Sequence, residues 1–187
     1  MKRIVLASAS PRRVELLKKI TQEFEIIPCT LPEEHPDLKP CEFVKSLAKF
    51  KAQNVFNSID KKENIIVIGS DTIVVKNNKV IGKPIDREDA VATLKKLSGR
   101  CHRVFTGVCL ISQGETRVFC VSSIVKFYKL TDLQINEYVD SGRAMDKAGS
   151  YGVQDSGFVK KVYGSIDCVV GLPTEKLKKE LKAFIKE

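Results

Sequence analysis

The chain has 187 residues, of which 43% are hydrophobic and 29% are charged. A chain of this length and composition can bury one substantial core, so an intrinsically disordered protein is excluded. No apolar run approaches the roughly 18 residues of a membrane span. The apolar stretch near the N-terminus is also too short for a secretion signal. The sequence therefore predicts a cytoplasmic protein with a single domain, residues 1–187.

The formal net charge is +9, from 32 basic and 23 acidic residues. A basic chain favours anionic partners, such as nucleic acid, a membrane surface or phosphorylated small molecules. The six cysteines show no metal-binding spacing, and those in apolar runs are expected to behave as small hydrophobic residues.

The first half of the chain alternates between strand and helix patterns. Ser10 and Pro11 suit the N-cap and the first position of a helix. The continuous apolar run at 65–69 is typical of a strand buried on both faces. In chain order we expect a strand at 3–7, a helix from 10, a strand at 24–28, a helix at 43–56 and a strand at 65–69 that resumes at 72–75.

The second half predicts two long strands and further helices. Asn77 and Asn78 favour a turn, and Thr131 with Gln134 forms a capping box. The expected elements are a strand at 80–81, a helix at 86–98, strands at 104–112 and 116–128, helices ending at Gly142 and starting at Thr174, and short strands between those helices. Together these elements predict a mixed α/β fold.

The segment Ser8–Arg13 is a candidate phosphate site. It leads from a strand into a helix N-terminus, whose unpaired N–H groups attract anions. Arg12 and Arg13 in the first turn oppose the helix dipole unless an anion lies between them and the helix end. The alternative is an ordinary capped helix with exposed arginines.

Asp71 is a candidate catalytic or metal-binding residue, because it lies within an aliphatic run. A buried carboxylate requires a partner, which we expect to be a divalent cation, a lysine or a cluster of backbone N–H groups. The alternative is a turn that interrupts the strand and leaves Asp71 at the surface.

Other polar residues complete the candidate set. Lys83 lies in a tight Gly-Lys-Pro corner, and Gln154 has an amide that suits the edge of a nucleobase. Glu33 and Lys51 supply a further acid and base. The set lacks a serine or cysteine nucleophile with a histidine base. It therefore favours hydrolysis of a phosphate ester or a phosphate anhydride by a metal-activated water.

The ordered set of segments SASPRR, GSDT, GKP, FTGV, MDKAGSYGVQ and VVGLP resembles the Maf family of nucleoside triphosphate pyrophosphatases. The resemblance extends from about Arg3 to Pro173. Arg12, Thr72 and Gln154 resemble the branch that acts on dTTP and UTP. The branch that prefers 7-methyl-GTP carries different residues at those positions.

The resemblance implies hydrolysis of a nucleoside triphosphate to the monophosphate and diphosphate with Mg²⁺ or Mn²⁺. It implies Asp71 as proton acceptor and a metal site at Glu33 and Asp71. The implied phosphate-binding residues are Ser8, Arg12, Arg13, Lys51 and Lys83, and the implied base-selecting residues are Arg12, Thr72 and Gln154.

The resemblance also implies two lobes around a cleft, a fold shared with inosine triphosphate pyrophosphatases, and a homodimer. Modified pyrimidine nucleotides are a further implied substrate class, removed in a house-cleaning role. No stable nucleic acid or membrane partner is expected. The alternatives are a pyrophosphatase for 7-methyl-GTP or other non-standard nucleotides, and a basic nucleic-acid-binding module.

The chain departs from the family pattern at two of these sites. Pro32 stands where an acid often precedes the glutamate, so Glu34 is an alternative to Glu33 as the acidic ligand. Asp155 follows Gln154 where glycine is usual, and we expect it to alter that loop.

Overall fold

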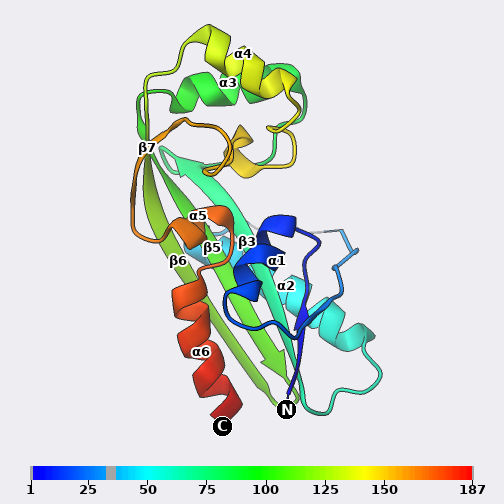
Figure 1. Ribbon diagram of the computed structural model, residues 1–187. Coiled ribbons are helices and arrows are strands. Elements are labelled where there is room, and N and C mark those ends of the chain that lie inside the picture. The colour runs from blue at the N-terminus through cyan, green and yellow to red at the C-terminus, as the bar shows by residue number, and fades with distance from the viewer. Residues whose placement is uncertain (1, 33–36, 187) are drawn as a thin grey trace. The chain divides into compact units, whose positions relative to one another are not determined.

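The computed structural model describes residues 2–32 and 37–186 (Figure 1). The described elements are β1 (Arg3–Leu6), α1 (Pro11–Lys18), β2 (Glu25–Ile26), α2 (Pro40–Ser58), β3 (Ile65–Lys76), β4 (Lys79–Ile81), α3 (Arg87–Leu97), β5 (Cys101–Ser112), β6 (Glu115–Phe127), α4 (Asp132–Asp140), the 3₁₀ helix η1 (Ala148–Ser150), β7 (Val159–Tyr163), α5 (Ile166–Val170) and α6 (Thr174–Lys186).

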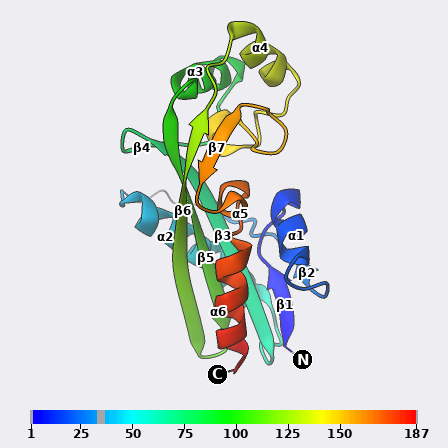
Figure 2. The ribbon, with the colours of Figure 1, turned by 60° about the vertical axis from the view of Figure 1, so that its left-hand side comes forward.

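The described strands form one seven-stranded sheet in the order β2-β1-β3-β5-β6-β7, with β4 paired to β3 (Figure 2). The pairs of β1 with β2 and with β3 are parallel. The pairs of β3 with β4 and of β6 with β7 are antiparallel. This mixed sheet with helices confirms the predicted α/β class.

Contacts divide the chain into two compact units. The first comprises Met1–Asp71, Thr106–Val121 and Gly171–Glu187, and the second comprises Thr72–Phe105 and Ser122–Val170. The two units agree with the two predicted lobes, whereas the cleft predicted between them stays a prediction. Each unit has its own apolar core. No helix among the described residues has both the length and the apolarity needed to cross a membrane.

In the first unit, α2 packs directly onto the sheet at two glycines. A Cβ atom on Gly69 in β3 would lie 2.2 Å from the carbonyl oxygen of Ala48 in α2. A Cβ atom on Gly107 in β5 would lie 2.2 Å from the carbonyl oxygen of Val44. Only glycine allows this approach, because any side chain would overlap the helix backbone.

The strand β3 differs from its prediction, because it runs without a break from Ile65 to Lys76. Gly69 and Ser70 suggested an interruption, but both lie within the strand. The glycine is needed for contact with α2 rather than for a turn. The turn predicted at Asn77 and Asn78 does form after the strand, and both residues adopt positive φ angles, of 51° and 60°.

In the second unit, α3 and α4 lie side by side (Figures 1 and 2). Both helices begin as predicted. The Asp86 carboxylate accepts a hydrogen bond from Asp89 N at 2.8 Å, and Thr131 and Gln134 form the reciprocal capping box. The sequence did not predict η1 or α5, and one strand, β7, forms where several short strands were expected.

The core of the second unit contains a histidine. His102 is 3% exposed, and its Nε2 lies 2.7 Å from the Tyr151 hydroxyl. The His102 ring makes T-shaped contacts with the rings of Phe127 and Tyr151. Burial, with a smaller contribution from Lys76, lowers the pKa of His102 from 6.5 to about 4.

We therefore expect stability to depend on His102 as the pH falls. The neutral ring is favoured in the fold, so its contribution is fully present above pH 6.5 and is lost progressively as the pH falls toward 4. The loss approaches about 3 kcal/mol of unfolding free energy. Urea titrations at pH 7 and pH 4.5 should show a smaller pH dependence for His102→Gln than for the wild type. Equal pH dependence in both proteins would contradict this role.

Candidate active site

The turn between β1 and α1 holds the first candidate residues. Ser8 lies two residues beyond the end of β1 and is 7% exposed. Its Oγ accepts hydrogen bonds from Ser10 N at 3.3 Å and Arg13 Nη1 at 3.2 Å. Arg13 Nε also donates to the carbonyl oxygen of Gly171 at 3.0 Å. Arg13 is therefore held in the first turn of α1 by groups from two other parts of the first unit.

Ser10 is the N-cap of α1, as expected, but its side chain makes no capping hydrogen bond. Pro11 occupies the first helical position, and the first turn contains no acidic residue. Arg12 lies beside Arg13 in this turn and is half-buried. The turn therefore combines helix N–H groups with two guanidinium groups, a combination that suits phosphate oxygens.

Strand pairing brings this turn alongside the middle of β3. Leu6 pairs with Ile68 in the parallel register, and Ala7 N donates to the Ile68 carbonyl oxygen at 2.8 Å. The Ser70 hydroxyl lies 2.9 Å from the Gly171 carbonyl oxygen, which is the same oxygen that Arg13 contacts. Gly171 thus links the β1–α1 turn to the residue that precedes Asp71.

Asp71 and Lys51 form an ion pair. Lys51 Nζ lies 2.5 Å from Asp71 Oδ1, and the two side chains are 12% and 11% exposed. Of the three partners predicted for a buried Asp71, the structure contains the lysine. The alternative of a surface turn is wrong, because Asp71 lies within a continuous strand and is 8% exposed as a residue.

The position of this pair follows from the contact at Gly69. Residues two apart in a strand share one face, so Gly69 and Asp71 both face α2. Lys51 lies in α2 between Ala48 and Ala52, the two residues that a Cβ on Gly69 would meet. The close approach of helix and strand therefore brings the ammonium group to the carboxylate.

The second unit holds the predicted residues Thr72, Lys83 and Gln154. Thr72 follows Asp71 in β3 and is half-buried, while Lys83 is exposed after β4. Gly149 N donates to the Gly82 carbonyl oxygen at 2.9 Å. Gly149 has a φ of 73°, and a Cβ there would lie 2.8 Å from Val74 Cγ2. These contacts fix η1 beside the Gly-Lys-Pro corner and β3.

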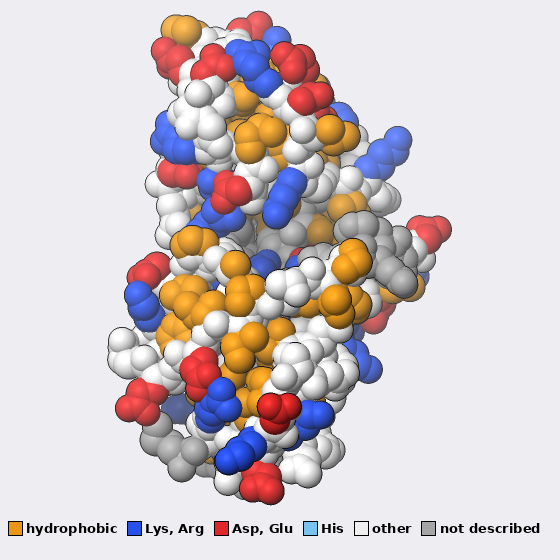
Figure 3. All heavy atoms as spheres, turned by 90° about the vertical axis from the view of Figure 1, so that its right-hand side faces the viewer, with side chains coloured by type: hydrophobic (Ala, Val, Ile, Leu, Met, Phe, Trp, Pro, Cys, Tyr) orange, Lys and Arg blue, Asp and Glu red, His pale blue; other side chains and the backbone are white. Residues whose placement is uncertain are grey.

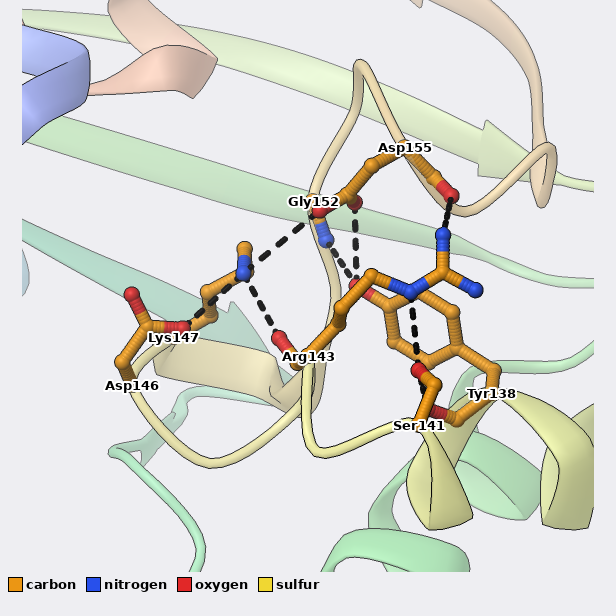
Figure 4. Close-up of polar contacts among 7 residues, drawn as sticks. All are labelled: Tyr138, Ser141, Arg143, Asp146, Lys147, Gly152 and Asp155. Carbon is orange, nitrogen blue, oxygen red and sulfur yellow. Dashed lines mark hydrogen bonds and ion pairs between the residues drawn. The ribbon is translucent and has the colours of Figure 1, made fainter.

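Gln154 lies exposed in a turn at 152–156, which closes through a hydrogen bond of 3.2 Å from Ser156 N to the Gly152 carbonyl oxygen. Tyr138 from α4 reaches the same turn: its hydroxyl accepts from Gly152 N and donates to Asp155, each at 3.0 Å (Figure 4). Tyr138 was not predicted as a site residue, because nothing in the sequence places α4 beside this turn.

The predicted acidic ligand Glu33, and its alternative Glu34, lie outside the described residues. Within the described part of the chain, no three histidine, cysteine, aspartate or glutamate side chains form a cluster suited to a metal ion. The structure therefore brings together Ser8 with Arg13 and Lys51 with Asp71, while the metal site stays a prediction. Ser70 and Gly171 were not predicted as site residues, although they lie in the family-like segments GSDT and VVGLP.

The fold is that of an α/β protein, and basic groups beside a carboxylate suit a phosphorylated ligand. The family described as "Maf-like protein" matches residues 3–184. The chain belongs to the Maf family, which confirms the resemblance.

Close relatives match the chain from end to end. A protein of Carboxydothermus hydrogenoformans named dTTP/UTP pyrophosphatase is 48% identical over 186 residues, which cover 97% of this chain and 98% of the relative. A protein of the same name from Clostridium botulinum is 44% identical, over 95% of this chain and 94% of the relative. Another from Clostridium perfringens is 43% identical, over 97% of each chain. Among solved structures, the Ham1 protein of Staphylococcus aureus matches with 15% identity and a TM-score of 0.49, covering 99% of this chain and 98% of that one.

Proposed function

We propose that this protein hydrolyses dTTP and UTP to the nucleoside monophosphate and pyrophosphate. Relatives that are 43–48% identical over nearly the whole chain and are named dTTP/UTP pyrophosphatase support the substrates. The observation that carries the chemistry is the Lys51–Asp71 pair, which places an ammonium group from α2 2.5 Å from a carboxylate on β3.

In the proposed reaction, a water attacks the α-phosphorus, and the bond between that phosphorus and the bridging oxygen breaks. Asp71 orients or deprotonates this water, and pyrophosphate leaves. Arg12, Arg13 and Lys83 offset the negative charge on the phosphate oxygens. Catalysis of this kind is largely electrostatic positioning.

Lys51 has two roles in this proposal. Without substrate its ammonium group lies against the Asp71 carboxylate, so that neither charge is buried without an opposite one beside it. A triphosphate brings a competing anion. We propose that Lys51 then contacts phosphate oxygen, which frees an Asp71 lone pair for the attacking water.

A divalent cation, Mg²⁺ or Mn²⁺, is part of the proposal. Asp71 is a hard oxygen donor, and Mg²⁺ in nucleotide enzymes is held by one or two carboxylates together with substrate phosphates. Asp71 and Glu33 are the proposed protein ligands. When bound, the cation would polarise the phosphate oxygens and stabilise the leaving pyrophosphate. Action in the cytoplasm and a homodimeric state also belong to the proposal.

The face shown in Figure 3 bears on the alternative of a nucleic-acid-binding module. Lys and Arg side chains on this face alternate with Asp and Glu side chains and form no continuous basic stripe. A stripe or patch of one sign is the electrostatic footprint of a nucleic-acid-binding surface. This face therefore lacks the basic stripe expected of a nucleic-acid-binding module.

Gln154→Ala should change the preference among nucleotides more than the rate on the best one. The side-chain amide can both donate to and accept from a pyrimidine edge, so its loss weakens discrimination by about tenfold. Steady-state kcat/KM values for dTTP, UTP and CTP would measure the change. An equal loss on every nucleotide would contradict a role in selecting the base.

A panel of nucleotides tests the proposed function. Purified protein with Mg²⁺ or Mn²⁺ is incubated with dTTP, UTP, CTP, dATP, GTP and 7-methyl-GTP, and pyrophosphate release is measured. Turnover that favours dTTP and UTP supports the proposal. Preference for 7-methyl-GTP would retain the reaction and overturn the base selection by Arg12, Thr72 and Gln154. No turnover, together with binding of nucleic acid that weakens steeply with salt, would favour the alternative.

A further inference from the structure

The turn that carries Gln154 is anchored at several atoms by side chains from outside it. The Tyr138 hydroxyl is the first anchor, because it accepts from Gly152 N at 3.0 Å and donates to Asp155 Oδ1 at 3.0 Å. Tyr138 is 3% exposed, and burial raises the pKa of its hydroxyl. The Tyr138 hydroxyl therefore keeps its proton throughout the neutral range and can donate its hydrogen bond to Asp155.

Lys147 is the second anchor. Its ammonium group lies 3.5 Å from Asp155 Oδ2, 2.6 Å from the Arg143 carbonyl oxygen and 2.9 Å from Asp146 Oδ1 (Figure 4). The Lys147 side chain is only 11% exposed, so these contacts are shielded from much of the solvent. Its three N–H donors match these three oxygens in number.

The backbone of the turn is held as well. Arg143 Nη1 donates to the Asp155 carbonyl oxygen at 2.9 Å, while its guanidinium carbon lies 4.9 Å from the centre of the Tyr138 ring. Gly152 has no room for a side chain, because a Cβ would lie 2.2 Å from Asp155 Oδ1. The carboxylate of Asp155 is therefore folded back over the start of its own turn.

Gln154 is the exposed residue between these fixed points. Its neighbour Asp155 is held through both its carboxylate and its carbonyl oxygen, and Gly152 is held through its N–H group. Fixing the backbone on both sides limits the directions in which the Gln154 side chain can leave the turn. A selecting group must be held within about 0.5 Å of its productive position to discriminate well.

We propose that Tyr138, Lys147 and Asp155 form a clamp that positions Gln154 and thereby sets the nucleotide preference of the enzyme. This inference rests on the proposed function, in which Gln154 selects the base. The three clamp residues are positioning residues, since they act through Gln154. The clamp predicts that base preference can be lost without any change at Gln154 itself.

Tyr138→Phe tests the clamp with the smallest change. The variant keeps the ring and removes the hydroxyl, so Gly152 N and Asp155 each lose a partner. We expect the ratio of kcat/KM for dTTP to kcat/KM for CTP to fall about tenfold, the size of effect expected when a hydrogen bond to a charged group is lost. Tyr128→Phe is the matched control, because Tyr128 lies in the same unit and is 50% exposed; it should leave the ratio unchanged.

A double variant tests whether Tyr138 acts through Gln154. In the Gln154→Ala background, adding Tyr138→Phe should not change the ratio further, because coupled residues are not additive. A purely structural role would lower the rates on both nucleotides in either background. Asp155→Asn provides a second route to the same loss, since it keeps the shape of the side chain and removes its charge.

Amide hydrogen exchange gives a readout that does not depend on activity. We expect protection at Gly152 to fall at least about tenfold in Tyr138→Phe, since its hydrogen-bond acceptor is gone. A folded Tyr138→Phe protein with unchanged exchange and an unchanged ratio would overturn the clamp. Wild-type protein that turns over none of the nucleotides would instead overturn the proposed function, and the exchange measurement would still decide whether the clamp holds the turn.

Discussion

Asp71→Asn should lower kcat on dTTP by at least about 10²-fold while the chain remains folded, the lower end of the effect of losing a general base. Asparagine has nearly the same volume and can still accept a hydrogen bond from Lys51, but it cannot take a proton from water or bind a cation as a carboxylate does. The measurement is single-turnover hydrolysis, with the fold checked by circular dichroism.

A second variant controls for the effect of this substitution on Lys51, the ion-pair partner of Asp71. The substitution removes a carboxylate charge from beside a lysine that is only 12% exposed, so some loss of stability accompanies the loss of rate. Adding Lys51→Met removes the buried ammonium group as well and should restore stability but not turnover. A folded Asp71→Asn protein with nearly normal turnover would contradict the role of Asp71.

Gly69→Ala should destabilise the protein by about 3 kcal/mol, at the upper end of the range for overpacked cores. The new Cβ would lie 2.2 Å from the Ala48 carbonyl oxygen and 2.8 Å from Ala52 N. Both are backbone atoms of α2, so no side chain can rotate to relieve the overlap. The helix must move away from β3, and Lys51 moves with it.

Gly82→Ala is the matched control, because a Cβ at Gly82 meets no atom within 4 Å. We expect its effect on stability to stay within about 0.5 kcal/mol. Urea unfolding of the two variants measures the difference directly. Equal stabilities would contradict the direct packing of α2 onto β3 and, with it, the geometric basis of the Lys51–Asp71 pair.

Local sequence signals predicted most element types and several of their ends. The cap at Asp86 and the capping box at Thr131 involve residues three positions apart, so the sequence alone contains both partners. The polar face of α6 and its buried side chains at Leu177, Leu181 and Phe184 also follow from local periodicity.

Long-range packing explains where the prediction was wrong. A glycine at position 69 is typical of a break in a strand. Its actual role is to allow close contact with α2, a helix about 20 positions away in the sequence. Lys51 was included for its charge and by resemblance, and its contact with Asp71 depends on that same helix packing. The link from Tyr138 to Asp155 spans 17 residues and two loops, and no local pattern indicates it.

Hydrolysis of dTTP in H₂¹⁸O is the most direct test of the central claim. Attack of water on the α-phosphorus predicts that one ¹⁸O atom enters dTMP and that pyrophosphate remains unlabelled, as read by mass spectrometry, with Asp71→Asn as the inactive control. Labelled pyrophosphate, or dTDP released with labelled phosphate, would show that another bond is broken and would contradict the account.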